Sequence, residues 1–426
     1  MQPLIRSTLV ATLIGPALLA AAQPSAPEAT SKGSPSGGKA AQAFAELQKK
    51  AYGQALVLYE QALAAEPGRP ELWNEYAICL RDLRRFPAAV RAGWRAIQLD
   101  GGKTVQLWNA QANTFMETRA WKAAQACLEK AEGFQKEPTS RAKVWLNLAF
   151  RMLAAGTTEG VVDISLRATR LDPGNSLAWI DLGLAQACSG DSKGATASLE
   201  KGLAMAEKQK DSQRADYTRQ LLAKVKAGES VWPPVVAGRS WQTLPDALLR
   251  LPEGDARQVA LPASVDHHYT LANGGTLSLT LPETWAEAFG ADLPGTPFSI
   301  HFSQPGHEGF KVLFSPIPGA GNPAGVKATA EDVVKRLKDR SAEKDLVLHE
   351  LSSAFMKGYW VLSTNDQLGD KEPAKGEYRH LLSAQLDVGG TQCVGTVLSN
   401  SKETEVLDPC LAVFSSARMG GIPVNR

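Results

Sequence analysis

The sequence of 426 residues lacks a dominant charge, with 46 Lys and Arg against 44 Asp and Glu and a formal net charge of +2. This near balance excludes nucleic-acid binding through a strongly basic surface. Cysteine is scarce, with five residues, and no two of them have zinc-ligand spacing. The first 260 residues lack histidine, and none of the six histidines forms a His-Glu-x-x-His motif. We therefore predict no metal site, no cofactor and no nucleic-acid partner.

Long apolar runs are also scarce, and the clearest one lies at the N-terminus. A single Arg6 precedes the apolar run from Leu9 to Leu19, and three alanines end at Ala22. This order is typical of a secretory signal peptide. The alternative, a membrane anchor, would need about 20 apolar residues to span a bilayer. We predict a signal peptide over residues 1–22, export to the periplasm or the exterior, and no transmembrane segment in the mature chain.

Two short motifs match catalytic or nucleotide-binding patterns in the wrong context. Residues 33–40, GSPSGGKA, have phosphate-loop spacing, but Ala40 replaces the hydroxyl residue and no strand precedes the motif. They fall in residues 23–40, a Pro, Ser and Gly-rich stretch that we predict to be a disordered linker. Residues 190–194, GDSKG, match a nucleophile elbow but lie between two predicted helices. Neither motif indicates an enzyme.

Four tryptophans, Trp73, Trp108, Trp145 and Trp179, stand 35, 37 and 34 residues apart, which indicates a repeat. Small residues recur four positions after each of them: Ala77, Ala112, Ala149 and Gly183. Residues 52–67 keep the second half of an earlier unit. Gly and Pro interrupt the chain between units, and residues 211–228 have the pattern of a solvated capping helix. We predict about five helical hairpins followed by this cap.

This pattern resembles the tetratricopeptide repeat, a family of paired antiparallel helices. The resemblance implies an all-α solenoid over residues 41–228, whose concave groove is lined by the first helix of each unit and binds an extended or helical peptide. Counted from each Trp, the residues implied for this groove are Asn74, Ile78, Arg81, Asn109, Asn113, Met116, Leu146, Phe150, Ile180 and Leu184. The early units offer amides and the later ones apolar side chains, which suits a partner with a polar and an apolar half. Alternatively, the chain's own capping helix or second domain covers the apolar positions.

A second domain follows residues 229–261, which we predict to be an interdomain linker interrupted by prolines. Period-two alternation predicts strands within 275–285, 297–303, 309–317, 346–354, 358–366, 378–388 and 391–400. Residues 328–341 and 401–418 have a helical pattern. We predict an α+β domain over 262–426 with a mainly antiparallel sheet. The order of elements and the phrase LSLTLPETW are similar to PsbP/Mog-type domains, which implies a non-catalytic binding or assembly module.

Cys393 and Cys410 are the only cysteine pair in the second domain, and an exported chain permits a disulfide between them. A loop of this size would contribute roughly 3 kcal/mol. Sequence alone leaves open whether the pair is bonded. The other three cysteines fit buried packing positions.

These observations favour an exported, non-catalytic scaffold that binds a partner protein or peptide, in envelope assembly or secretion. Two alternatives remain open. The first is an enzyme whose active site in the second domain is formed by histidines and carboxylates that folding brings together. The second is a purely structural subunit of an envelope complex. Converging His, Asp or Glu side chains in an accessible pocket would favour the enzyme.

Overall fold

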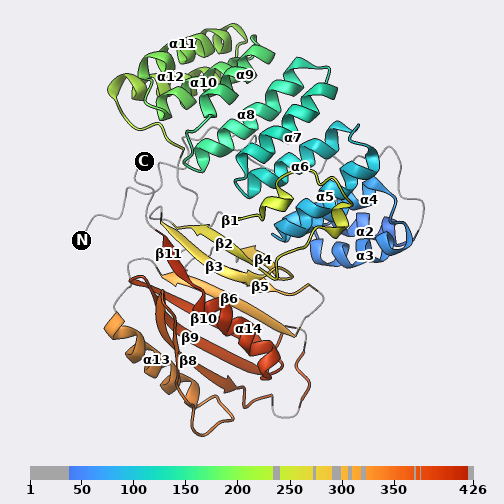
Figure 1. The fold of residues 1–426 in the computed structure, drawn as a ribbon. Helices are drawn as coiled ribbons and strands as arrows, with labels where there is room; N and C mark the ends of the chain where they lie inside the picture. Colours follow the sequence, from blue (N-terminus) through green and yellow to red (C-terminus); the bar gives the residue numbers. More distant parts are fainter. Residues whose placement is uncertain are drawn as a thin grey trace. The chain divides into compact units, whose positions relative to one another are not determined.

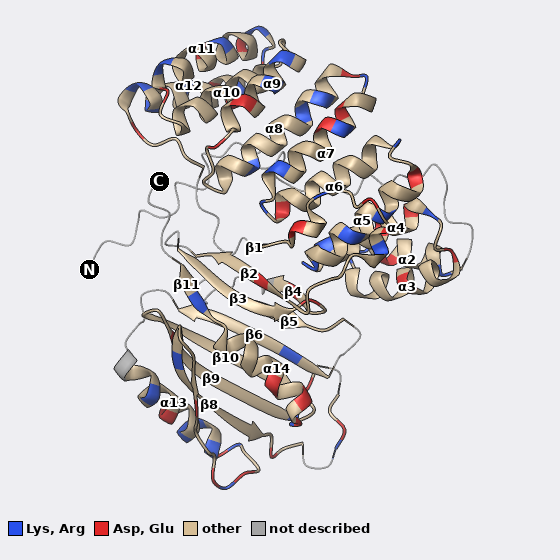
Figure 2. Ribbon diagram, in the orientation of Figure 1, with Lys and Arg blue, Asp and Glu red and all other residues tan. Residues whose placement is uncertain are grey.

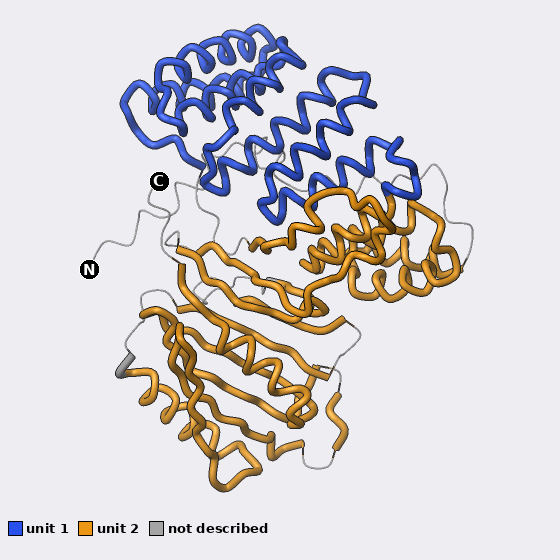
Figure 3. Tube along the Cα trace, in the orientation of Figure 1, with its two compact units in different colours: residues 1–32, 97–235, 424–426 blue, residues 33–96, 236–423 orange. Residues whose placement is uncertain are grey.

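The structure, a computed structural model, describes residues 38–233, 240–271, 275–289, 299–305, 309–317, 323–368, 371–374 and 376–420 (Figure 1). The predicted signal peptide and nearly all of the predicted disordered linker lie outside the described residues. The chain forms two compact units (Figure 3): unit 1 contains residues 97–233, and unit 2 contains residues 38–96 and 240–420, as far as these are described. Within the described ranges, every helix is too short or too polar to cross a membrane.

The N-terminal helices form consecutive hairpins, which confirms the predicted helical repeats. In unit 2 these are α2 (Lys39–Gln48), α3 (Tyr52–Ala65), α4 (Pro70–Asp82) and most of α5 (Phe86–Asp100). Unit 1 continues with α6 (Val105–Glu117), α7 (Trp121–Phe134), α8 (Pro138–Ala154), α9 (Val161–Leu171), α10 (Ser176–Cys188) and α11 (Ser192–Lys208). Helix α12 (Ser212–Ala227) follows in the predicted capping position and packs on α11.

The small residues of the repeat allow close helix packing, as α10 and α11 show. A Cβ atom on Gly183 would lie 2.6 Å from Cγ of Leu199, and one on Gly202 would lie 2.7 Å from Cγ1 of Ile180. Both distances are shorter than a carbon–carbon contact of about 3.5–4.0 Å. Glycine at these two repeat positions is therefore a packing requirement.

The repeated tryptophans do more than fill space between hairpins. The indole Nε1 of Trp73 donates to the carbonyl oxygen of Pro67 at 2.8 Å, and Trp108 and Trp179 bond the carbonyl six residues earlier at 2.9 and 3.0 Å. Each of these indoles ties its helix to the preceding turn. Trp145 differs because α8 begins seven residues before it rather than three; its indole donates to Glu132 Oε2 at 2.9 Å instead.

Unit 2 also contains two antiparallel sheets, which confirms the predicted α+β class. The smaller has the order β1 (Ser240–Gln242), β2 (Ser264–Thr270), β3 (Thr276–Pro282) and β11 (Arg418–Gly420). The larger has the order β4 (Ala286–Phe289), β5 (Ile300–Ser303), β6 (Phe310–Ile317), β10 (Thr391–Ser399), β9 (His380–Val388), β8 (Met356–Thr364) and β7 (His349–Ser352).

The inner residues of both sheets share one hydrophobic core with α14 (Thr404–Ser415). Helix α13 (Pro323–Lys338) packs on β8 and β9. Seven predicted strands and both predicted helices are therefore present, and the resemblance to PsbP/Mog-type domains remains a prediction.

Two predicted boundaries differ from the structure. The predicted linker contains β1 and two short 3-10 helices, Asp246–Leu248 and Ala256–Gln258, whose Leu248 and Ala256 are fully buried. A three-residue strand is too short for an alternation pattern to reveal, and it forms because β2 offers a partner. At the other end, the predicted helix over 401–418 stops before Arg418, which begins β11 by pairing with β3.

The sequence left open whether Cys393 and Cys410 are bonded, and the structure shows no disulfide between them. Cys393 on β10 and Cys410 on α14 are both free and buried in the shared core. The Cys410 thiol donates to the carbonyl of Val406 at 3.1 Å. Burial raises the pKa of both thiols to about 12, so they remain protonated and act as apolar packing residues.

Candidate partner-binding surface

The first helix of the third repeat presents two amide side chains one turn apart. Asn109 and Asn113 on α6 are both half-buried. The side-chain oxygen of Asn109 is shielded from solvent and accepts no hydrogen bond from the described residues. A buried acceptor without a donor costs about 1–3 kcal/mol. Because this oxygen is shielded, a donor from outside the chain can reach it only if the Asn109 side chain turns outward.

A polar seam joins α6 to α8, the first helix of the next repeat. Arg151 on α8 forms an ion pair with Glu117 on α6, and its Nε donates to Asn147 Oδ1 at 3.3 Å. The Asn147 amide in turn reaches the Met116 sulfur at 3.9 Å. Arg151 is only 9% exposed. Because its charge is paired within the chain, this seam positions the two helices and presents little net charge.

Most of the predicted apolar groove residues are buried. Ile180 is fully buried and its side chain lies against Gly202 of α11, inside the hairpin. The predicted groove residues that are nearly inaccessible are Asn74, Ile78, Met116, Leu146, Ile180 and Leu184. These six residues cannot serve as exposed contacts, so the prediction that they line an open groove is wrong.

Four predicted positions keep partial exposure: Arg81, Asn109, Asn113 and Phe150. Arg81 belongs to unit 2 and lies 3.8 Å from Asp82. The other three lie on α6 and α8, two helices that contact each other within unit 1. We name Asn109, Asn113 and Phe150, together with the polar seam beside them, the α6–α8 face.

A buried carboxyl group on α10 was missed by the sequence prediction. Asp181 is 6% exposed, and its Oδ1 has no hydrogen-bond partner among the described residues. Burial raises the pKa of Asp181 to about 7, and the positive charge of Arg214 on α12 only partly opposes this. The Arg214 guanidinium is engaged elsewhere, donating to Ser176 at 2.9 Å and pairing with Asp211 at 3.3 Å. One sequence signal was available, a lone acid in the otherwise apolar stretch SLAWIDLGLAQAC.

Unit 2 does bring together a histidine and a carboxylate, as the enzyme alternative requires. His267 Nδ1 and the Tyr269 hydroxyl each lie 2.9 Å from Glu287 Oε2, and Ser240 donates to Oε1 at 2.7 Å. Burial alone would raise the pKa of Glu287, but the hydrogen bond and charge of His267, with further donors and cations, hold it below its usual value. The side chains of His267 and Glu287 are 3% and 0% exposed. A substrate therefore has no access to this pair.

The same cluster holds the turn between α4 and α5 against the sheets. The backbone N–H of Glu287 donates to the carbonyl of Leu83 at 3.1 Å, and the Gln242 side chain donates to the carbonyl of Arg84. Arg85 forms an ion pair with Glu283 at 3.2 Å. Within unit 2 these bonds fasten the first repeats to the α+β domain. The described residues also hold no group of three or more His, Cys, Asp or Glu suited to a metal.

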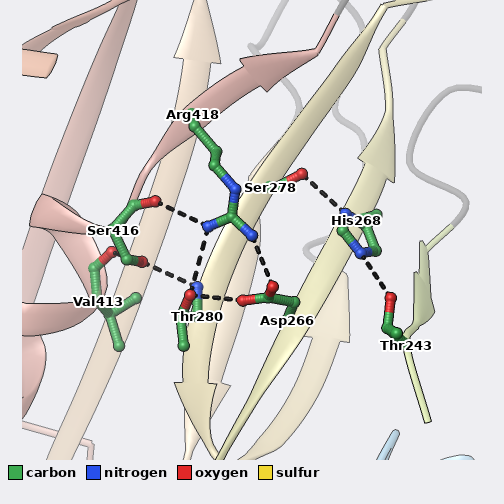
Figure 4. Close-up of polar contacts among 8 residues, drawn as sticks. All are labelled: Thr243, Asp266, His268, Ser278, Thr280, Val413, Ser416 and Arg418. Atoms are coloured by element: carbon green, nitrogen blue, oxygen red, sulfur yellow. Dashed lines mark hydrogen bonds and ion pairs between the residues drawn. The ribbon is translucent and has the colours of Figure 1, made fainter. Parts of the chain in front are cut away.

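A second polar cluster lies on the face of the small sheet opposite the core (Figure 4). Arg418 donates to Asp266 at 2.7 Å, and Thr280 donates to the other oxygen of this carboxylate at 2.6 Å. His268 lies 2.8 Å from the Ser278 hydroxyl through Nδ1 and 3.2 Å from a second hydroxyl through Nε2. These groups satisfy one another across β2, β3 and β11, so the cluster supports the sheet.

Comparison with known proteins identifies the repeat. Residues 46–92 match the tetratricopeptide repeat family, whereas no curated protein matches the chain. Similar solved structures include MamA from Desulfovibrio magneticus RS-1 (17% identity, 40% of this chain and 94% of that one, TM-score 0.33). YrrB, described as a tetratricopeptide protein with an unusual peptide-binding site, is 16% identical over 42% of this chain and 88% of its own (TM-score 0.32). Pseudomonas aeruginosa pilF is 17% identical over 44% and 90% (TM-score 0.30). Residues 46–92 thus match the tetratricopeptide repeat, and the helical hairpins that follow them resemble it.

Proposed function

We propose that this protein is an exported, non-catalytic scaffold that binds a partner protein or peptide on the α6–α8 face. The observation that carries the proposal is the pair of half-buried amide side chains, Asn109 and Asn113, which lie one turn apart on α6. Backbone N–H and C=O groups of a bound peptide can pair with such amides, and these bonds do not depend on the partner's side chains.

The spacing of the two asparagines suits an extended peptide. Residues four apart on a helix have Cβ atoms about 5–6 Å apart, and alternate residues of an extended chain lie about 6.6 Å apart. Each amide offers both a donor and an acceptor, so Asn109 and Asn113 can pair with two peptide groups on the same side of a strand. Phe150 offers one apolar contact beside them. The partner segment is thus an extended chain with one apolar side chain.

Electrostatics supports a partner segment of low net charge. Arg151, which lies in the polar seam of the α6–α8 face, is already paired with Glu117. Figure 2 shows both charge signs distributed over the helices of unit 1. A highly acidic or basic peptide would find no matching field there.

Export and an envelope assembly or secretion context are part of the same proposal. They rest on the residue order of positions 1–22, where one basic residue, an apolar run and small residues follow one another. An enzymatic role for the α+β domain finds no comparable support, since its converging His267 and Glu287 are sealed in the core.

Crosslinking in intact cells tests the binding surface. The full chain and an Asn109→Ala, Phe150→Ala double variant are captured after crosslinking, with Gln213→Ala, which removes an exposed amide from α12, as the matched control. We expect the double variant to lose the partner at least tenfold, while the control retains it. Circular dichroism verifies that all three chains are folded. An unchanged set of partners in the double variant would refute binding at the α6–α8 face.

A further inference from the structure

The seven-stranded sheet ends at an accessible edge. Strand β7 is its last member and pairs with β8 alone among the described strands. His349, Glu350 and Ser352 are exposed, and Leu351 is half-buried against the core. An edge strand carries a row of backbone donors and acceptors that another strand can use.

The turn after β7 fixes which backbone groups point outward. The N–H of Ser353 donates to the carbonyl of Met356 at 2.9 Å, so Ser353 faces β8. Because the backbone N–H and C=O groups of successive residues point alternately to the two sides of a strand, those of Leu351 and His349 also point toward β8. The N–H and C=O groups of Glu350 and Ser352 therefore point away from the sheet.

Exposed apolar side chains flank this edge on both sides. Val347 before β7 is 60% exposed and Phe355 after it is 58% exposed. Between them His349 stacks on Trp360 with ring centroids 4.3 Å apart. Val347 lies in the segment before β7 and Phe355 in the turn after it.

We propose that β7 pairs antiparallel with β7 of a second copy of this chain, about a two-fold axis at Leu351. This register places the outward groups of Glu350 opposite those of Ser352. It also brings the two copies of Leu351 into contact at the axis. The segment is self-complementary, as a two-fold interface requires.

Neighbouring registers fit less well. An axis at Glu350 places two carboxylates directly opposite each other, which is unfavourable. An axis at His349 places Glu350 opposite Leu348, which lies before β7. Only the axis at Leu351 pairs the outward backbone groups of Glu350 and Ser352 with each other, within β7, and avoids opposing charges. The inference is independent of the α6–α8 face, which lies in the other unit.

Cysteine crosslinking tests the register. At the axis, Leu351→Cys meets its own copy at a Cα separation of about 4.5 Å, within the range of a disulfide. His349→Cys serves as the control, because it faces Ser353 of the other copy and its own copy is more than 7 Å away. Under mild oxidation we expect a covalent dimer of the full chain with Leu351→Cys, and none with His349→Cys or the parent chain, whose five cysteines are free. Equal crosslinking by both variants would overturn the register.

A proline substitution tests the pairing itself. Glu350→Pro removes an N–H that points outward and leaves the bonds to β8 intact, whereas Glu350→Ala keeps the N–H. Light scattering at tens of micromolar should show a dimer mass for the parent and Glu350→Ala, and half that mass for Glu350→Pro. A parent chain that is monomeric at 100 µM, a dimer that persists in Glu350→Pro, or crosslinking of Leu351→Cys to a different protein would each overturn the proposal.

Discussion

The replacement Asp181→Asn should stabilise the protein, and by more as the pH rises. The pKa of Asp181 is about 7 in the folded chain against an ordinary value of 3.8. Because folding raises this pKa, the folded state binds the proton more tightly, so stability is greatest at low pH and falls as pH rises from about 4 to about 7. Asparagine stays neutral throughout and avoids this loss.

The magnitude follows from the two pKa values. At pH 5 the folded carboxyl is protonated and the unfolded one is ionised, so the unfolding free energy of the parent is about 1.6 kcal/mol lower than at low pH, at 1.36 kcal/mol per pH unit. At pH 8 both carboxyls are ionised, and the loss of unfolding free energy reaches its full value of about 4 kcal/mol. The stability gain of Asp181→Asn over the parent should therefore grow by about 2.5 kcal/mol between pH 5 and pH 8.

Hydrogen exchange of α10 and α12 peptides in the full chain, measured over a urea series at both pH values, reports this free energy. Asp163→Asn, at an exposed position on α9, is the matched control and should change it by less than about 0.5 kcal/mol at either pH. A difference between Asp181→Asn and the parent that is the same at pH 5 and pH 8 would show that the carboxyl does not titrate in this range. A variant that is less stable than the parent at pH 8 would show that the ionised carboxylate is stabilised by Arg214.

Four further outcomes are expected. Gly202→Ala places a methyl group against Ile180 and should cost about 1–3 kcal/mol in urea denaturation, whereas Gly133→Ala on α7, with open space around it, should be neutral or stabilising. Trp179→Phe loses the bond to the preceding turn and should cost about 1 kcal/mol, seen as faster exchange at the start of α10. Glu287→Gln leaves its buried donors mispaired, so we expect a loss of about 3 kcal/mol and earlier thermal unfolding of unit 2. Protein recovered from cells should have an intact mass that begins after Ala22; a mass retaining residues 1–22 would contradict export with cleavage.

Local patterns predicted most of the secondary structure. The spacing of Trp73, Trp108, Trp145 and Trp179 is sufficient to identify the repeats, because each unit uses the same close contacts. Alternation likewise identifies the longer strands, where one face meets the core. Strand β1 was missed because three residues show no period, and its pairing depends on β2, more than 20 residues later.

The binding surface was harder to predict because a repeat position does not determine exposure. Asn109 and Ile180 both follow the repeated Trp by one residue, yet only Asn109 keeps partial exposure. Ile180 turns into its hairpin because Gly202 leaves room for it. In this hairpin a small residue on the second helix leaves room for a side chain of the first helix. A search for groove residues should read both helices together.

Two buried acids, Asp181 and Glu287, show why charge chemistry is still harder to predict from sequence. Asp181 and Glu287 are both shielded from water and burial acts to raise both pKa values, yet the pKa of Asp181 is raised and that of Glu287 is lowered. The difference lies in their donors. Glu287 receives bonds from residues 18 to 47 positions away, brought to it by β1 and β2, while one oxygen of Asp181 has no donor among the described residues. Since those distances along the chain exceed any local pattern, the ionisation state of a buried acid is a property of the assembled fold.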